Sequence, residues 1–323
     1  MIIFTLIFLI IPSAFADFDL AQLMTVHVEN DVGTIGGPGT DHSYTQGLQF
    51  GYVKTIKDVP TWASPFTDLA TQSNVGYIIS QKLFTPNGIG TGDLKIDDQP
   101  YAGWLSLANF YHFKNEYRSH IIELNIGVIG PESGGENMQY TYHKATNYLI
   151  AQGWHNQLAT EPTLEASYQQ RIHLTEKSFT PDNKIFDAFG LYGGDFGNVL
   201  IDGYFGAMTR FGFFIPDDDG PARPSLLNGE RFIKSEGSNN KFYVYTFASA
   251  RLVAVGRNIF LDGNTFKPSH RVKKKIGVFE NEIGLSVNYC NFNLTWSYVT
   301  ITPQFDEKDE TTSFASVSPS FLF

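Results

Sequence analysis

Apolar and polar residues alternate with a period of two along many segments of the chain, which predicts β-strands. The segment 314–323, FASVSPSFLF, alternates apolar residues with serines, and 291–300, NFNLTWSYVT, alternates Phe, Leu, Trp and Tyr with Asn, Thr and Ser. One face of such a strand would contact lipid and the other a polar interior. A soluble β-sandwich gives the same alternation, but the terminal Phe323 favours a barrel, because a last strand ending in an aromatic residue resembles the sorting signal of bacterial outer-membrane proteins.

Twelve segments carry strand patterns, an even number, as single-chain bacterial barrels require. They are 22–31, 43–54, 73–83, 101–113, 119–129, 162–175, 184–194, 199–213, 241–256, 276–289, 291–302 and 312–323. A helix is predicted at 136–152, after Gly134-Gly135 and before Gly153. We therefore expect an all-β fold, a twelve-stranded antiparallel transmembrane β-barrel with a short helix in an extracellular loop.

The number of strands also predicts which connections lie on the same side of the membrane. If both termini are periplasmic, the connections 32–42, 84–100, 130–161 and 257–275 lie outside. The connection 215–240 then falls on the periplasmic side, where turns are expected to be short. This indicates either an unusual loop there or a miscounted strand.

Composition agrees with a barrel. Aromatic residues make up 15% of the chain while its mean hydropathy is -0.16, and no run after residue 16 reaches the length of a transmembrane helix. The net charge of -10 argues against nucleic-acid binding, and the single Cys290 excludes an internal disulfide. The apolar start ends in Ala14-Phe15-Ala16, so we expect a signal peptide at 1–16 and one barrel domain at 17–323.

The candidate metal-binding and catalytic residues lie where the first two predicted strands meet. Asn30 and Asp31 end the first strand and Thr45 begins the second, while His143 lies on the loop helix and can fold over the same rim. Their oxygen atoms suit a hard cation such as Ca²⁺. A nearby imidazole could act as general base, which would give an esterase without a serine nucleophile. Asn-Asp before glycine is also ordinary turn chemistry, and a lone histidine can be a surface residue.

Several motifs together resemble the outer-membrane lipid A 3′-O-deacylase family of the LpxR type, whose members are twelve-stranded, calcium-dependent barrels. The motifs are END at 29–31, TDHSYTQG at 40–47, QPYAGWL at 99–105, GVIGPESGGENMQ at 127–139, QGWHNQL at 152–158 and RNIFLDGNTF at 257–266. The resemblance implies that Asn30 and Asp31 bind Ca²⁺, that Thr45 and Gln139 belong to the active site, and that His143 is the catalytic base. It further implies a lipopolysaccharide substrate, removal of a 3′-linked acyl chain of lipid A, and a monomer in the bacterial outer membrane with its site facing the extracellular leaflet.

Two positions depart from the family pattern. An acidic residue is expected six positions after the catalytic histidine, where this chain has Leu149, and the second outer loop, TPNGIGTGD at 85–93, has no Lys or Arg. Glu136 or Asp41 could supply a carboxylate instead.

Other interpretations remain open. Ser133 could be a nucleophile, although it lacks the G-x-S-x-G context, and Trp154 could anchor the chain at the membrane interface. The basic run 271–275 is either a loop in solvent or a patch for phosphates, and Asp262-Gly263 predicts a hairpin turn. A barrel without catalysis, serving as a pore or structural protein, is the main rival function. A phospholipase acting on glycerophospholipids is another.

Overall fold

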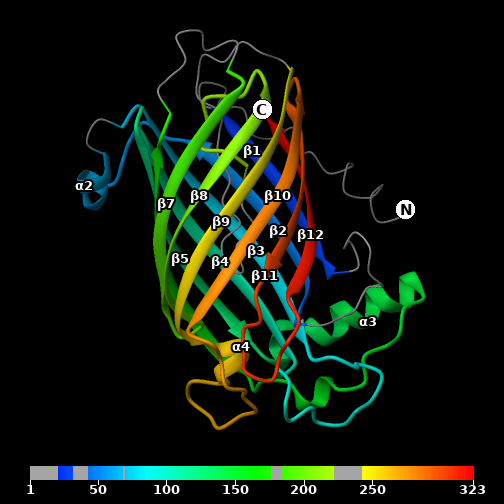
Figure 1. Cartoon of the computed structure of the whole chain (residues 1–323). Coiled ribbons are helices and arrows are strands. Elements are labelled where there is room, and N and C mark those ends of the chain that lie inside the picture. Colours follow the sequence, from blue (N-terminus) through cyan, green and yellow to red (C-terminus); the bar gives the residue numbers. More distant parts are fainter. Residues whose placement is uncertain (1–20, 32–42, 68–69, 176–183, 222–241) are drawn as a thin grey trace.

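The computed structural model describes residues 21–31, 43–67, 70–175, 184–221 and 242–323. Its twelve strands form one closed antiparallel barrel in which each strand pairs with its neighbours in sequence and β1 pairs with β12 (Figure 1). The strands are β1 Gln22–Asn30, β2 Ser43–Thr55, β3 Gln72–Thr85, β4 Ala102–Lys114, β5 Arg118–Ile129, β6 Glu161–His173, β7 Phe186–Gly197, β8 Leu200–Phe213, β9 Phe242–Asn258, β10 Gly277–Tyr289, β11 Phe292–Ile301 and β12 Thr312–Leu322. The predicted fold class and strand number are confirmed. The expected signal peptide lies outside the described residues.

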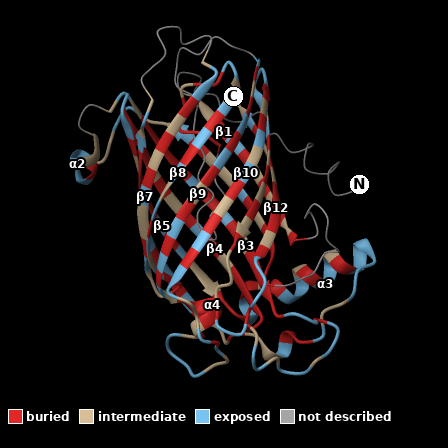
Figure 2. Ribbon diagram, viewed as in Figure 1, coloured by how far each residue is buried: buried red, intermediate tan, exposed pale blue. Residues whose placement is uncertain are grey.

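Buried and exposed residues alternate along the strands (Figure 2), which indicates that successive side chains point to the lumen and to the outer wall. On β12, Ser316 and Ser318 are buried, whereas Phe321 is 42% exposed on the outer face. On β11, Thr295 is buried and Leu294 is 42% exposed. Small polar side chains therefore face inward and large apolar ones outward, which is the pattern of a barrel surrounded by lipid.

Short helices decorate both ends of the barrel. The β2–β3 connection contains η3 Thr61–Ala63 and α2 Ser64–Thr67, at the end where the C-terminus lies (Figure 1). At the opposite end are η4 Pro131–Ser133, α3 Gly135–Thr146 and η5 Trp154–Asn156 between β5 and β6, and α4 Ile259–Asp262 between β9 and β10. In the part of the chain that the structure describes, no helix has the length and apolar character needed to span a membrane.

Two local predictions need correction. The helix predicted at 136–152 ends at Thr146, because Asn147 adopts the left-handed conformation with φ 59° and stops it. The hairpin turn predicted at Asp262-Gly263 is instead the end of one helical turn, where the Asn258 side chain accepts a hydrogen bond from the Phe260 backbone and Gly263 has φ 78°. In both cases the residue types predicted that the chain changes direction, but they did not predict which kind of turn it forms.

Aromatic packing fills the lumen at the end that carries α3 and α4. Phe260 of α4 stacks on Phe84 with ring centroids 3.8 Å apart, and Trp104 packs beside it. Tyr44 contacts Phe84 from the neighbouring strand. These residues belong to one buried cluster that crosses the lumen, so α4 and its loop close this end of the barrel.

The connection after β8 fills the other end. The strand count was correct, and residues 214–221 form the described part of an unusual loop on the side of the termini. Asp219 is fully buried between the inward-facing His112 and His173, at 2.7 and 3.3 Å. Asp218 pairs with the buried Arg210, which also binds Asp187. Since a buried charge is stable only when paired, this network holds the loop inside the barrel.

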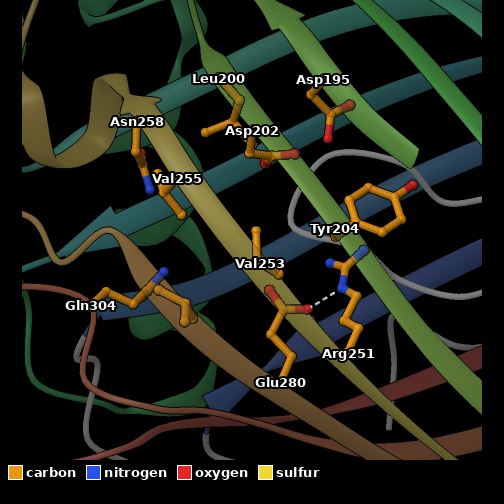
Figure 3. A pocket seen from close by; sticks show the side chains of 11 residues that line it. Asp195, Leu200, Asp202, Tyr204, Arg251, Val253, Val255, Asn258, Glu280 and Gln304 are labelled. Atoms are coloured by element: carbon orange, nitrogen blue, oxygen red, sulfur yellow. Dashed lines mark hydrogen bonds and ion pairs between the residues drawn. The ribbon is translucent and has the colours of Figure 1, made fainter. Parts of the chain in front are cut away.

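Between the two ends, the described part of the lumen contains a small cavity of about 30 Å³. Side chains of β7 to β10 line it, and Arg251 forms an ion pair with Glu280 at 2.5 Å (Figure 3). Asp195 and Asp202 face the same space from adjacent strands. None of the predicted site residues lines this cavity, so the candidate chemistry lies elsewhere.

Candidate functional site

Helix α3 lies against the outer wall of the barrel at its rim. Strand alternation turns Phe84 into the lumen and Leu83 outward, yet Leu83 is only 1% exposed because Trp154, Tyr101 and Met138 cover it. A Cβ on Gly135 would lie 2.8 Å from the Leu83 side chain and 3.0 Å from the Gly103 backbone. The Gly134-Gly135 pair that predicted a helix start therefore also permits this close approach.

One face of α3 carries the polar residues that the sequence analysis selected. Gly135, Gln139 and His143 are its buried residues, and their spacing of four places them in one row along the helix. The Gln139 carboxamide oxygen accepts a hydrogen bond from Trp154 Nε1 at 2.7 Å. Its Nε2 atom is buried and has no hydrogen-bond partner among the described residues. Trp154 is 2% exposed, so the prediction that it anchors the chain at the membrane interface is wrong; it orients Gln139 instead.

The imidazole of His143 is fixed by the main chain that follows the helix. Its Nδ1 atom lies 2.5 Å from the carbonyl oxygen of Leu149, and the turn at Asn147 brings this carbonyl back toward the helix. A carbonyl oxygen can only accept, so Nδ1 carries the hydrogen. In the neutral ring Nε2 is then the proton acceptor. This is the arrangement required of a general base.

The strand residues gather at the neighbouring corner of the rim. Asp31 follows β1 and Thr45 lies at a bulge of β2, and each is 1% exposed. Asn30 pairs with Gln46 in the sheet, one position from Thr45. The Thr45 hydroxyl lies 2.7 Å from that of Thr85. Asn30, Asp31 and Thr45 therefore share one corner, as expected.

Strand β3 connects the two halves of the site. Thr85 and Leu83 are two residues apart and so lie on the same side of the strand. Thr85 bonds Thr45, while Leu83 packs under α3 and η5. The strand group and the helix group thus adjoin the same stretch of the outer wall.

Two residues that were not selected from the sequence, Gln99 and Lys308, support the β2 bulge at Thr45. Gln99 Nε2 donates to the carbonyl oxygens of Ser43 and Thr85, at 2.7 and 3.2 Å. Lys308 donates to the Ser43 hydroxyl and to Thr312. Gln99 begins the QPYAGWL motif, which was the only signal that could have pointed to it; nothing local marks Lys308.

Two of the remaining alternatives, Ser133 and the basic run, make structural contacts. Ser133 donates its hydroxyl hydrogen to the Gly130 carbonyl at 2.6 Å, which fixes the turn before α3. Glu136, one of the two alternative carboxylates, is exposed on α3, and His155 of η5 is an exposed histidine in the same connection. In the basic run, Lys274 and Lys273 form ion pairs with Asp262 and Asp306.

The donor set suits a hard cation but is incomplete within the described residues. Asp31 offers a carboxylate, Asn30 an amide oxygen and Thr45 a hydroxyl, which are ligand types that Ca²⁺ accepts. Ca²⁺ takes about six to eight oxygen ligands, and no group of three or more His, Cys, Asp or Glu in the described ranges is arranged to hold a metal ion. Asp41, the other candidate carboxylate, lies outside them. The residue types present at this corner therefore fit a calcium ion.

Comparison with known families gives a clear result. The model of the family described as "Outer membrane protein LpxR" matches residues 2–323. The chain belongs to the LpxR family. It is therefore an outer-membrane barrel, as its strand pattern predicted. No curated protein sequence matches it significantly.

Solved structures support the same fold. LpxR from Salmonella typhimurium superposes with a TM-score of 0.78 at 19% identity, over 93% of this chain and all of that one. The NanC porin and the translocator domain of the autotransporter NalP from Neisseria meningitidis reach TM-scores of only 0.38 and 0.39. The NanC porin is 8% identical, and the match covers 92% of this chain and 98% of the porin. The NalP domain is 10% identical, and the match covers 94% of this chain and 87% of that domain. At these identities the similarity to Salmonella LpxR shows the fold, and roles of residues rest on the geometry described above.

Proposed function

We propose that this LpxR-family barrel is a calcium-dependent lipid A deacylase that removes a 3′-linked acyl or acyloxyacyl chain, acting as a monomer from the extracellular leaflet. The observation that carries the proposal is the oriented His143 on a helix that lies against the outer wall of the barrel. A site on the outer wall adjoins lipid, so an ester in the membrane could reach it without entering the lumen. The family membership and the oxygen donors at the adjoining corner support the same conclusion.

The residues have separate tasks in this mechanism. His143 takes a proton from water at Nε2, the resulting hydroxide adds to the ester carbonyl carbon, and the sugar hydroxyl leaves with the proton that His143 returns. Asn30 and Asp31 would hold Ca²⁺, which when bound supplies positive charge near the ester carbonyl. The Thr45 hydroxyl and the buried Nε2 of Gln139 are donors that can orient the substrate oxygen atoms.

Mass spectrometry of lipid A tests the proposal. Membranes that contain the protein are compared in calcium and in chelator, beside His143→Ala and the matched control His155→Ala, which removes an exposed histidine of the same loop. We expect a mass loss of one 3′ acyl substituent in the wild type and in His155→Ala only, and only with calcium. An unchanged lipid A mass in the wild type with calcium would refute the deacylase proposal, and fatty acid released from glycerophospholipids instead would favour the phospholipase.

A further inference from the structure

A polar row interrupts the apolar outer wall at the end of the barrel that carries the termini. His120 of β5, Gln170 of β6 and Tyr192 of β7 are direct neighbours in the sheet. Strand alternation turns all three outward, because Ser119, Ile121, Gln169 and Leu191 beside them are buried in the lumen. Nearer the middle of the barrel, the same outer face carries Leu124, Ile126 and Leu164, which are 53%, 52% and 57% exposed.

Hydrogen bonds organise this row into one unit. His120 Nδ1 lies 2.9 Å from the Tyr168 hydroxyl, and the Tyr192 hydroxyl donates to Gln170 Oε1. Gln170 is only 7% exposed although it faces outward, because these aromatic side chains surround it. The row is therefore a built surface rather than scattered polar residues.

The β2–β3 connection covers part of the row from outside the barrel. Phe66 of α2 packs against His120 and Tyr168, with ring centroids 5.7 and 6.0 Å apart. Trp62 of η3 packs edge-on against Tyr111 at 5.1 Å and is still 51% exposed. Exposed aromatic residues of this kind are typical of the membrane–water interface, which places the row at headgroup level.

Two donors of the row have no acceptor among the described residues. In that part of the chain no hydrogen bond engages Gln170 Nε2, and no carboxylate forms an ion pair with the exposed Arg118. Arg118 faces the same side as His120, two residues away on β5. Unpaired donors facing lipid are unfavourable. An acceptor-rich, negatively charged group would satisfy both donors at once.

We propose that Arg118 and Gln170, in the row organised by His120 and Tyr168, bind the phosphodiester headgroup of a glycerophospholipid in the leaflet at this end of the barrel. The acyl chains would lie on Leu124, Ile126 and Leu164, and the α2 segment would cover the headgroup from the side. Because Arg118 is a full positive charge, an anionic lipid such as phosphatidylglycerol binds more tightly than zwitterionic phosphatidylethanolamine. The site is at the opposite end from His143 and does not depend on the proposed deacylase activity.

Native mass spectrometry of the full-length protein in detergent tests this site. Phosphatidylglycerol, phosphatidylethanolamine and diacylglycerol are titrated into wild type, Arg118→Gln and the matched control Lys54→Gln, which removes an exposed cation on β2 at the same end of the barrel. We expect Arg118→Gln to weaken phosphatidylglycerol binding at least fivefold, Lys54→Gln to leave it unchanged, and diacylglycerol to bind weakly to all three. The conservative Arg118→Lys should recover part of the lost affinity.

Two outcomes would overturn the proposal. Equal phosphatidylglycerol affinity in all variants would mean that lipid contacts the barrel only as an unspecific annulus. Diacylglycerol bound as tightly as phosphatidylglycerol would mean that the headgroup is not recognised. The shift in mobility between heated and unheated samples on a gel verifies that each variant is folded, so weak binding cannot be confused with a misfolded barrel.

Discussion

The Nδ1 atom of His143 hydrogen-bonds to the main-chain carbonyl of Leu149, six residues further along the chain. The family resemblance leads one to expect an acidic side chain at this position, but the Leu149 side chain is 64% exposed and only its backbone meets the imidazole. A carbonyl fixes the tautomer as a carboxylate would, without adding a negative charge. The base is therefore oriented by the shape of the turn after α3 rather than by the residue type at 149.

The first prediction follows from that turn. Asn147 holds φ at 59°, a conformation that glycine adopts freely and β-branched residues strongly disfavour. We expect Asn147→Gly to retain deacylase activity and Asn147→Val to lower kcat by about tenfold or more, because the Leu149 carbonyl would move away from Nδ1. Steady-state kinetics on purified lipid A measure both. Equal kcat in the two variants would show that the turn does not control the base.

The second prediction concerns the hydroxyl pair at the bulge. Thr85→Val keeps the shape of the side chain but removes the hydrogen-bond partner of Thr45. A hydrogen bond of this kind contributes about 1 kcal/mol, so we expect kcat/KM to fall about fivefold. Thr55→Val is the control, since it breaks a hydroxyl contact to Asn74 near the other end of the same strand pair. A comparable loss in both variants would indicate general destabilisation of the barrel instead of a local effect on Thr45.

The third prediction separates the enzyme from the rival pore. The Phe84–Phe260 stack fills the lumen at one end. At the other end the 214–221 loop fills it, with Asp218 bound to Arg210 and Asp219 bound to His112. We therefore expect no steady conductance when the purified barrel is inserted into planar bilayers. A known porin inserted under the same conditions serves as the positive control. A large, steady conductance for this chain would contradict the closed lumen and favour the pore.

Period-two alternation was sufficient to predict the barrel, because lumen and lipid impose opposite requirements on successive residues. Every predicted strand is present, with ends that differ by at most three residues. The alternation carries no information about what the loops do after the strands end. Residues 214–221 return into the lumen because Asp218 pairs there with Arg210 and Asp219 with His112. Asp219 and His112 are 107 residues apart in sequence, so local sequence could not predict that contact.

The candidate site was predictable only in part for a related reason. Asn30, Asp31 and Thr45 flank one connection, so antiparallel pairing of the two strands brings them to one corner. His143 was selected first as an imidazole on the loop helix, whereas Gln139 was identified only through the family resemblance. The indole N–H of Trp154 orients Gln139, and the main-chain carbonyl of Leu149 orients His143. A tryptophan is usually read as an apolar residue, and a main-chain carbonyl is present at every position. The residue types at 149 and 154 therefore could not predict either contact.

The last prediction uses the cation that supports the start of β2. Burial lowers the pKa of Lys308 to about 8, while the nearby Asp98 and Glu310 oppose the shift. Below pH 8 the ammonium is charged in both folded and unfolded chains, and the cost of burying it is present in full. Between pH 8 and about 10.4, the usual lysine value, the folded protein releases this proton and the unfolded chain keeps it. Because the unfolded chain then binds more protons, the contribution of Lys308 to the free energy of unfolding becomes more favourable as pH rises.

Urea unfolding of the barrel in lipid vesicles at pH 7.5 and 9.5 measures this effect as the difference between wild type and Lys308→Met. We expect the wild type to gain stability relative to Lys308→Met as pH rises. Lys273→Met is the control: that lysine is 82% exposed beside Asp306, which raises its pKa, so it remains charged over the whole range in both states. The same pH slope in wild type and Lys308→Met would show that Lys308 does not release its proton in this window. In that case the ammonium remains charged in its contacts with Ser43 and Thr312, and the start of β2 is held by a permanent cation.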